Sequence, residues 1–247
     1  MKTRIDQRLV ELGLFDSRAR ARAAIEAGRV RADGRVVGKP SEAVAPDAVI
    51  EAEPAHPWVG RGALKLVHAL DLWPIAVGGR VVLDVGASTG GFTEVCLSRG
   101  ARRVFAVDVG RGQLHARLRD DPRVTSLEGI DARALDATLV DEAPAVVVCD
   151  ASFIGLAKVL PAALALATAG ADLVCLVKPQ FEAGPKDVGR GGLVKDQAVH
   201  ARVLGEVRDW LEAQGWRVRD TAVSPIDGGE GQREYLLWAS GPGEAIR

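Results

Sequence analysis

Residues 81–91, VVLDVGASTGG, indicate the fold of most of this 247-residue chain. The apolar run Val81–Val85 is typical of a buried strand, and a helix is expected to begin near Phe92. The glycines between them allow a tight turn in which backbone N–H groups can approach a ligand closely. This stretch therefore predicts the first strand, loop and helix of a ligand-binding α/β domain.

The chain after residue 80 repeats this alternation of short apolar strands and helices. Such alternation is typical of a mostly parallel sheet covered on both faces. The last two strands flank a glycine-rich loop and are expected to form an antiparallel pair at the sheet edge. The predicted strands are Val81–Val85, Arg103–Val107, Ala145–Cys149, Leu173–Val177, Trp216–Val223 and Glu234–Ala239, and the predicted helices include Phe92–Arg99 and Leu156–Ala167.

The beginning of the chain differs in charge. Residues 1–39 contain ten Lys and Arg against five Asp and Glu, so they carry +5 in a chain whose total is −1. Apolar residues at helical spacing predict two helices, the second capped by Asp16 or Ser17, and Asp33-Gly34 predicts a hairpin turn. A basic segment of this kind suggests a polyanionic partner.

These patterns divide the chain into three parts and exclude some classes of protein. We expect a small α+β domain at residues 1–55, a linker at 56–61 and the α/β domain at 62–241. The first residues lack the apolar segment of a secretory signal, and no apolar stretch is long enough to span a bilayer. The three cysteines lack metal-ligand spacing. A cytoplasmic protein without a membrane or metal partner is therefore expected.

The glycine loop favours one cofactor over another. A dinucleotide site requires G-x-G-x-x-G, whereas the spacing here is Gly86-x-x-x-Gly90-Gly91. An anionic Asp84 would repel a pyrophosphate but would suit the ammonium and sulfonium of S-adenosylmethionine. Acids that follow the next strands could bind the ribose and the adenine edge, although a turn without a ligand is the alternative. The predicted cofactor-binding residues are Asp84, Gly86, Ala87, Ser88, Gly90, Gly91, Phe92, Asp108, Val109, Asp131 and Asp150.

Four charged residues remain as candidates for catalysis. Asp150 and Lys178 end the fourth and fifth predicted strands, where ligands of open α/β sheets bind. Neither residue suits a buried strand unless it is paired or functional. Lys65 lies in the segment GRGALK, and Glu234 begins the last strand. Ordinary ion pairs at strand ends are the alternative.

Six motifs carry a family resemblance: RGALKL, LDVGASTGGFTE, AVDVGRGQL, CDASFI, LVKPQFE and EYLLW, in this order. With them the chain resembles the TlyA, or haemolysin A-like, family, whose catalytic domain is similar to FtsJ-type ribose 2′-O-methyltransferases. The resemblance implies a Rossmann-like class I methyltransferase fold preceded by a small S4-like RNA-binding domain. It also implies a catalytic tetrad formed by Lys65, Asp150, Lys178 and Glu234. The implied substrate is cytidine in ribosomal RNA, with the large subunit favoured.

The tetrad suits methylation of a ribose hydroxyl. The hydroxyl must be aligned with the methyl carbon, and its proton must be taken or stabilised. We assign Lys178 as the base or hydroxyl-activating group, with the two carboxylates orienting the lysines, while the choice between the lysines stays open. The Asp-Pro-Pro-aromatic turn of amine methyltransferases is missing after strand four, and strand alternation turns Cys149 away from the side used by Asp150. Both observations favour an oxygen acceptor.

RNA is expected to contact basic residues in both domains. The N-terminal arginines suit phosphates, and a glycine-rich basic loop at residues 183–195 could hold further phosphates near the site. A membrane-active haemolysin and a catalytically silent RNA-binding or ribosome assembly factor are the competing functions. The predicted RNA-binding residues are Arg4, Arg18, Arg20, Arg22, Arg29, Arg61, Lys186 and Arg190.

Overall fold

The computed structural model describes residues 2–15, 17–228 and 231–243. Its contacts divide the chain into two compact units, Met1–Pro57 and Trp58–Arg247. The second unit thus begins inside the segment that the sequence predicts as a linker. Each unit has its own hydrophobic core.

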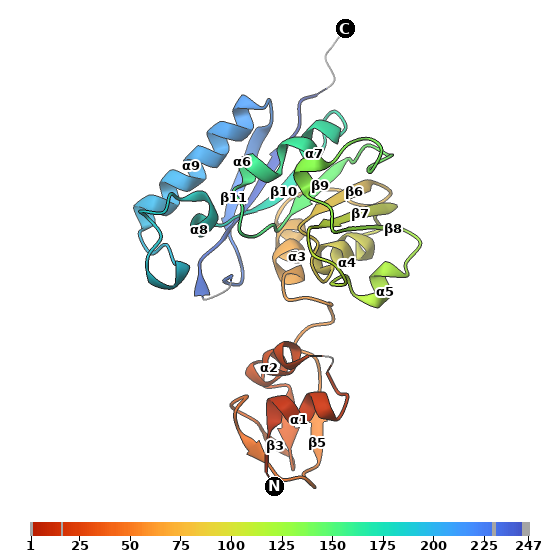
Figure 1. The fold of residues 1–247 in the computed structure, drawn as a ribbon, viewed down its shortest axis with the longest axis vertical. Helices are drawn as coiled ribbons and strands as arrows, with labels where there is room; N and C mark the ends of the chain where they lie inside the picture. The colour runs from red at the N-terminus through yellow and green to blue at the C-terminus, as the bar shows by residue number, and fades with distance from the viewer. Residues whose placement is uncertain (1, 16, 229–230, 244–247) are drawn as a thin grey trace. The chain divides into compact units, whose positions relative to one another are not determined.

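The first unit packs two helices against short strands (Figure 1). Ser17 caps the second helix by accepting a hydrogen bond from the Arg20 backbone N–H at 3.4 Å, while Asp16 lies outside the described residues. Asp33 and Gly34 both have positive φ, 51° and 76°, as the predicted hairpin turn requires. The elements are β1 (Thr3–Arg4), α1 (Ile5–Glu11), α2 (Arg18–Glu26), β2 (Val30–Ala32), β3 (Arg35–Val36), β4 (Ala43–Val44) and β5 (Ile50–Ala52).

The second unit contains a seven-stranded sheet with the order β11-β12-β10-β9-β6-β7-β8. Neighbouring strands from β8 to β10 are parallel, and β12 is antiparallel to both β10 and β11. The predicted α/β fold, with a mostly parallel sheet and a C-terminal antiparallel pair, is confirmed. The strands are β6 (Val81–Val85), β7 (Arg103–Asp108), β8 (Val124–Glu128), β9 (Val146–Cys149), β10 (Asp172–Val177), β11 (Arg217–Val223) and β12 (Tyr235–Ser240).

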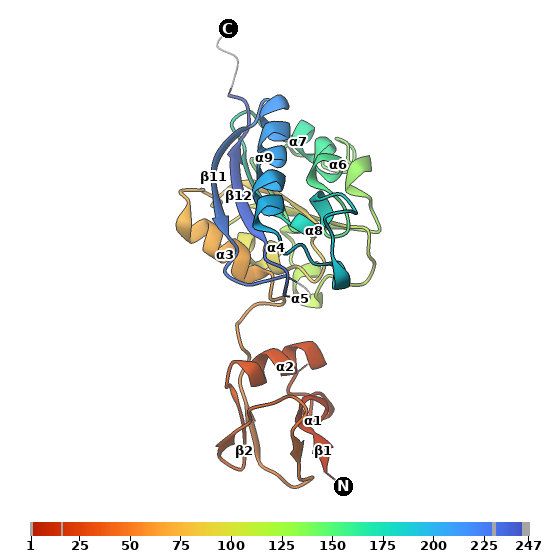
Figure 2. The ribbon, with the colours of Figure 1, turned by 90° about the vertical axis from the view of Figure 1, so that its left-hand side faces the viewer.

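Helices cover both faces of this sheet (Figures 1 and 2). One face packs against α3, α4 and α5, and the other packs against α6, α7 and α9. No helix in the described ranges is long and apolar enough to cross a membrane. The helices are α3 (Ala63–Leu72), α4 (Gly91–Ser98), α5 (Ala116–Arg119), α6 (Leu156–Val159), α7 (Pro161–Leu166), α8 (Pro179–Glu182) and α9 (Gln197–Ala213).

One predicted helix is divided into two in the structure. Leu156–Ala167 is not a single helix, because α6 ends at Val159 and α7 begins at Pro161. Proline has no backbone N–H and its ring obstructs the preceding turn, so it is favoured at the first position of a helix.

The register of β12 places the first residue of this strand beside the carboxyl end of β10, at the end of the sheet that carries the site. Tyr235 pairs with Val177, the last residue of β10, in an antiparallel ladder. Glu234 directly precedes Tyr235 and Lys178 directly follows Val177, so both residues lie at the same end of these two strands. The carboxyl ends of β6, β7 and β9 also meet at this end, because these strands run parallel to β10.

Candidate active site

The four candidate catalytic residues form one connected chain of charges. Lys65 Nζ lies 2.6 Å from Glu234 Oε2 and 3.6 Å from Asp150 Oδ2. Lys178 Nζ lies 2.7 Å from Asp150 Oδ1. Asp150 is 19% exposed at its side chain, and the other three side chains are 8% exposed or less. Sequence reasoning predicted that these residues would meet, and the structure brings all four together.

Lys178 makes more contacts than the sequence suggested. Besides the ion pair with Asp150, its ammonium donates to the Asp150 backbone carbonyl at 3.0 Å and to Ser152 Oγ at 2.8 Å. An ammonium carries three N–H donors, so these acceptors can fix the position of Nζ. Ser152 was not among the predicted residues, although it lies only two positions after Asp150.

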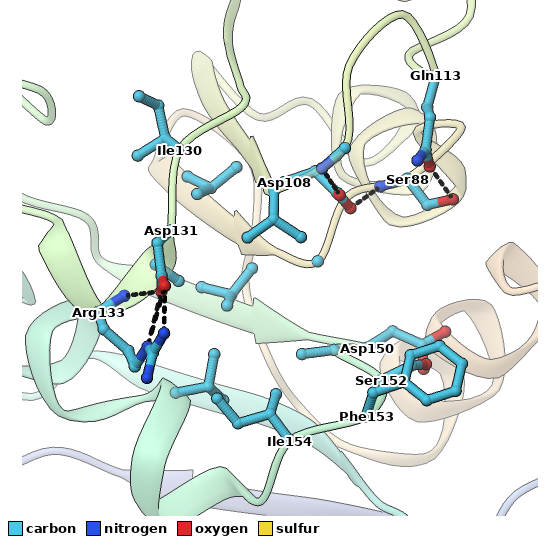
Figure 3. Close-up of a pocket in the computed structure, with 18 residues that line it drawn as sticks. Ser88, Asp108, Gln113, Ile130, Asp131, Arg133, Asp150, Ser152, Phe153 and Ile154 are labelled. Carbon is cyan, nitrogen blue, oxygen red and sulfur yellow. Dashed lines mark hydrogen bonds and ion pairs between the residues drawn. The ribbon is translucent and has the colours of Figure 1, made fainter.

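A cavity of about 580 Å³ lies beside this cluster, between the loops that follow β6, β7 and β9 (Figure 3). Gly86 allows two of these loops to touch. It has a φ of +82°, and a Cβ built on it would lie 2.8 Å from Ala151 Cα. Any larger residue would push the loop after β9 away from the loop after β6.

Asp108 holds the glycine loop after β6, residues 86–91, in place at the rim of the cavity. One carboxylate oxygen accepts a hydrogen bond from the Ser88 N–H at 2.8 Å, and the other accepts from the Gly110 N–H at 2.7 Å. Gln113, which sequence reasoning missed, also lines the cavity and accepts a hydrogen bond from Ser88 Oγ at 3.2 Å.

Nine of the eleven predicted cofactor-binding residues line this cavity or the one beside it. Asp131 lines the larger cavity, but Arg133 also binds its carboxylate, with Nε at 3.0 Å. The Arg133 hydrogen bonds lower the pKa of Asp131 to about 2. The nine residues are Gly86, Ala87, Ser88, Gly91, Phe92, Asp108, Val109, Asp131 and Asp150.

Asp84 differs from the expectation of an exposed anion facing a ligand. Asp84 is 0% exposed and lines neither cavity. Thr93 Oγ1 donates a hydrogen bond to Asp84 Oδ2 at 2.6 Å. Burial raises the pKa of this carboxyl to about 7, and the negative charges of Asp150 and Asp108 add to the shift. The reason is topological: β6 is a central strand, and Asp84 lies on the sheet face that α4 covers. Gly90, the other residue outside both cavities, packs against Leu114 and Leu118.

A smaller cavity of about 270 Å³ contains the tetrad. All four charged residues line it, together with Arg61 and glycines of the loops around it. It shares Gly86, Ser88, Asp150 and Ser152 with the larger cavity. The two cavities therefore meet at Asp150, one lined largely by apolar groups and the other by charges.

Phe153 is an exposed aromatic residue that sequence reasoning did not assign to the site. It lines the larger cavity, its residue is 91% exposed, and its backbone has a φ of +66°. Figure 3 shows Phe153 in the site. Its ring centroid lies 5.2 Å from that of Phe181. Positive φ is strained for a residue with a bulky side chain, and such strain is concentrated at functional sites. The sequence signal was the large apolar residue directly after Asp150-Ala-Ser.

The basic residues predicted to bind RNA fall into separate groups. Arg4, Arg18 and Arg22 all contact the carboxylate of Asp6. Arg29 pairs with Glu53 at 3.3 Å, and the Arg20 backbone contributes to the cap of α2. In the second unit Arg61 lines the smaller cavity, while Lys186 and Arg190 are exposed on the loop before α9.

Known proteins match the chain over almost its full length. Residues 58–240 match the family described as FtsJ-like methyltransferase, and residues 3–50 match the S4 domain. The 16S/23S rRNA (cytidine-2′-O)-methyltransferase TlyA of Mycobacterium tuberculosis is 48% identical over 96% of this chain and 89% of its own length. Hemolysin A of Brachyspira hyodysenteriae is 36% identical over 94% of this chain and 98% of its own length.

A solved structure extends the match to three dimensions. A candidate hemolysin from Streptococcus thermophilus aligns with a TM-score of 0.77 and 36% identity, covering 99% of this chain and 91% of that one. The family resemblance carried by the six motifs is thereby confirmed. The chain belongs to the TlyA, or haemolysin A-like, family of FtsJ-like methyltransferases, and it also contains an S4 domain.

Proposed function

We propose that the chain transfers a methyl group from S-adenosylmethionine to the ribose 2′-hydroxyl of a cytidine in ribosomal RNA. The observation that carries this proposal is the tetrad of Lys65, Asp150, Lys178 and Glu234, which lines a small polar cavity directly beside a larger, mainly apolar one. The larger cavity suits a cofactor, and the smaller one suits a polar acceptor group that must be oriented and deprotonated.

The larger cavity fits S-adenosylmethionine in size and in chemistry. Its volume of about 580 Å³ lies within the range of roughly 300–1,000 Å³ that is usual for small-molecule sites. Asp108 lies at the carboxyl end of the second strand of the parallel sheet, where a ribose hydroxyl pair can be bound. The cofactor would supply an already activated methyl group, so the protein has to prepare only the acceptor.

Lys178 is placed to prepare that acceptor. Asp150 and Ser152 hold its Nζ at the boundary between the two cavities. A 2′-hydroxyl in the smaller cavity would replace one of these contacts. As an ammonium, Lys178 would donate a hydrogen bond to its oxygen and stabilise the negative charge that develops there; as a neutral amine, it would accept the hydroxyl proton. Lys65, which is paired with Glu234, contacts Asp150 from the other side, and these two residues complete the charge balance.

The names of the relatives guide the choice of substrate. The Mycobacterium tuberculosis relative is named for both 16S and 23S rRNA, so its name does not select one subunit. We propose that this chain prefers the large subunit. We further propose that the enzyme acts in the cytoplasm, where ribosomal subunits would be accessible. The competing haemolysin function rests on names of relatives, and leakage of dye from liposomes by the pure protein would favour it.

The deciding experiment uses purified bacterial ribosomal subunits and S-adenosylmethionine with a labelled methyl group. We expect label in the RNA, recovered as 2′-O-methylcytidine after complete nuclease digestion. Label on a base would contradict ribose methylation, and no transfer to either subunit or to free RNA would contradict the enzymatic function.

Replacing Asp108 with alanine tests the cofactor site. The substitution removes the hydrogen bond from Ser88 that holds the glycine loop and a local one from Gly110, as well as the proposed acceptor for ribose hydroxyls. We expect the affinity for S-adenosylmethionine to fall about tenfold, the equivalent of one charge-assisted hydrogen bond. Isothermal titration calorimetry measures this change. Asp136→Ala, which alters an exposed aspartate that lines neither cavity, is the control. Equal affinities of Asp108→Ala and the parent would contradict this placement.

Replacing Phe153 with alanine tests a contact with RNA. An exposed aromatic ring beside the site can stack on an unpaired base, a contact worth about 1–3 kcal/mol. We expect KM for the RNA to rise about tenfold, while the affinity for S-adenosylmethionine changes much less. Phe153→Trp should retain activity because it keeps a stacking surface. A Phe153→Ala variant with unchanged kinetics would show that the ring has no part in RNA binding.

A further inference from the structure

One carboxylate in the first unit gathers three arginines. Asp6 is 0% exposed, and its two oxygens accept hydrogen bonds from Arg4 at 3.0 and 3.1 Å, from Arg18 at 2.9 Å and from Arg22 at 3.2 Å. The hydrogen bonds from these arginines, that from Arg4 first, hold the pKa of Asp6 well below its usual range. We therefore expect the carboxylate to be ionised at neutral pH.

The three arginines carry more charge than Asp6 can balance. Three guanidiniums and one carboxylate leave a local charge of +2 in the described contacts. Their side chains are 42% to 48% exposed, so each combines a fixed contact to Asp6 with a surface open to solvent. Each guanidinium has five N–H groups, and Asp6 accepts only four from the three side chains together.

The cluster includes the N-terminal end of α2. Arg18 is the first residue of α2, and the first turn of that helix contains no acidic residue. The N-terminal end of a helix carries partial positive charge and favours anions rather than cations. Arginines gathered at such a point increase the local positive potential, which an external anion can balance.

We propose that Asp6 is a positioning residue that holds Arg4, Arg18 and Arg22 as one preorganised site for RNA phosphates. This inference rests on the proposed function and adds to it a role for a buried acid. Arginine loses considerable side-chain freedom when it is immobilised. Asp6 fixes the three side chains during folding, so that this cost does not weaken the binding of RNA.

The substitution Asp6→Asn separates preorganisation from simple charge. Removing an acid from a phosphate-binding surface makes it more positive, and charge alone would then strengthen RNA binding. The loss of Asp6, however, frees three arginine side chains at once, and each of them must then be immobilised again when RNA binds. We therefore expect the affinity of the full chain for labelled large-subunit rRNA to fall about tenfold. A loss of this size is equivalent to the loss of one charge-assisted hydrogen bond.

The salt dependence gives a readout that a structural role would not change. Each lost phosphate contact makes the slope of log K against log salt shallower by about 0.7 to 0.9. We expect Asp6→Asn to reduce the slope by one such step or more, even though its net charge is higher. Glu11→Gln removes an exposed acid from the same unit, and its affinity and slope should stay near those of the parent.

A second pair of variants remains informative if Asp6→Asn does not fold. Arg22→Lys keeps the charge but lacks the planar group with several donors that can bind Asp6 and a phosphate together. It should lower RNA affinity severalfold, whereas Arg35→Lys, at an exposed arginine paired with Glu42, should not. Circular dichroism confirms that each variant is folded.

Methyl transfer distinguishes failure of this inference from failure of the proposed function. At saturating RNA, folded Asp6→Asn should reach the parent's kcat with a higher KM. Binding by Asp6→Asn that equals or exceeds the parent's overturns the inference, as does parent-like binding by Arg22→Lys. A parent chain that binds RNA but transfers no methyl group overturns the proposed function instead.

Discussion

Replacing Lys178 with alanine is expected to reduce methyl transfer to ribosomal RNA by about 10²–10⁴-fold, the range of effects of a positioned acid or base. The substitution removes the only tetrad group held by both Asp150 and Ser152 among the described contacts. Without it, the hydroxyl loses the group that orients its oxygen and accepts or stabilises its proton. Single-turnover transfer of labelled methyl groups measures the chemical step directly.

Binding measurements show whether the loss in Lys178→Ala is chemical. Lys178 lines the smaller cavity but not the larger one, so we expect the affinity for S-adenosylmethionine to change less than threefold, below one charge-assisted hydrogen bond. Lys158→Ala, at an exposed lysine on α6 that lines neither cavity, should transfer methyl groups at the parental rate. Parental activity in Lys178→Ala would exclude its proposed role and leave Lys65 as the candidate base.

Sequence reasoning predicted that the candidate catalytic residues would meet, because the main determinants are local. Asp150 and Lys178 each follow an apolar strand, and parallel strands bring their carboxyl ends together. Glu234 was harder to place, because its position depends on the pairing of Tyr235 with Val177 across an antiparallel ladder. A register of this kind depends on long-range packing, so only the family motifs indicated it.

The misjudged residues share one cause, which is that exposure depends on tertiary packing. Asp84 was expected to face a ligand, but α4 and Thr93 enclose it. Phe153 follows a buried strand, and no sequence pattern predicted its exposure or its positive φ. The N-terminal arginines were expected to contact RNA phosphates, and only the fold shows that three of them converge on Asp6.

The enclosed carboxyl of Asp84 makes the stability of the protein depend on pH. Its pKa is about 7 in the folded protein, chiefly because burial disfavours the charged form, against about 3.9 in an unfolded chain. Between these values the folded state keeps a proton that the unfolded state has lost, so the free energy of unfolding falls as the pH rises. The loss begins near pH 4 and is complete above pH 7. At 1.36 kcal/mol per pKa unit, the full loss is on the order of 4 kcal/mol.

Replacing Asp84 with asparagine should remove this dependence, because the amide does not titrate. Asparagine keeps an acceptor for Thr93 but leaves an N–H group without an obvious partner, since Asp84 Oδ1 has none. The variant can therefore be less stable than the parent at pH 5, by about 1–3 kcal/mol. From pH 5 to pH 8, its free energy of unfolding should rise relative to the parent's by about 2–3 kcal/mol.

Urea denaturation without cofactor at several pH values measures this change. Asp136→Asn is the control: hydrogen bonds from Thr138 lower the pKa of the Asp136 carboxyl, so that group is ionised in both the folded and the unfolded state from pH 5 to pH 8, and its replacement should leave the pH dependence unchanged. A difference between Asp84→Asn and the parent that does not vary with pH would show that Asp84 is ionised throughout.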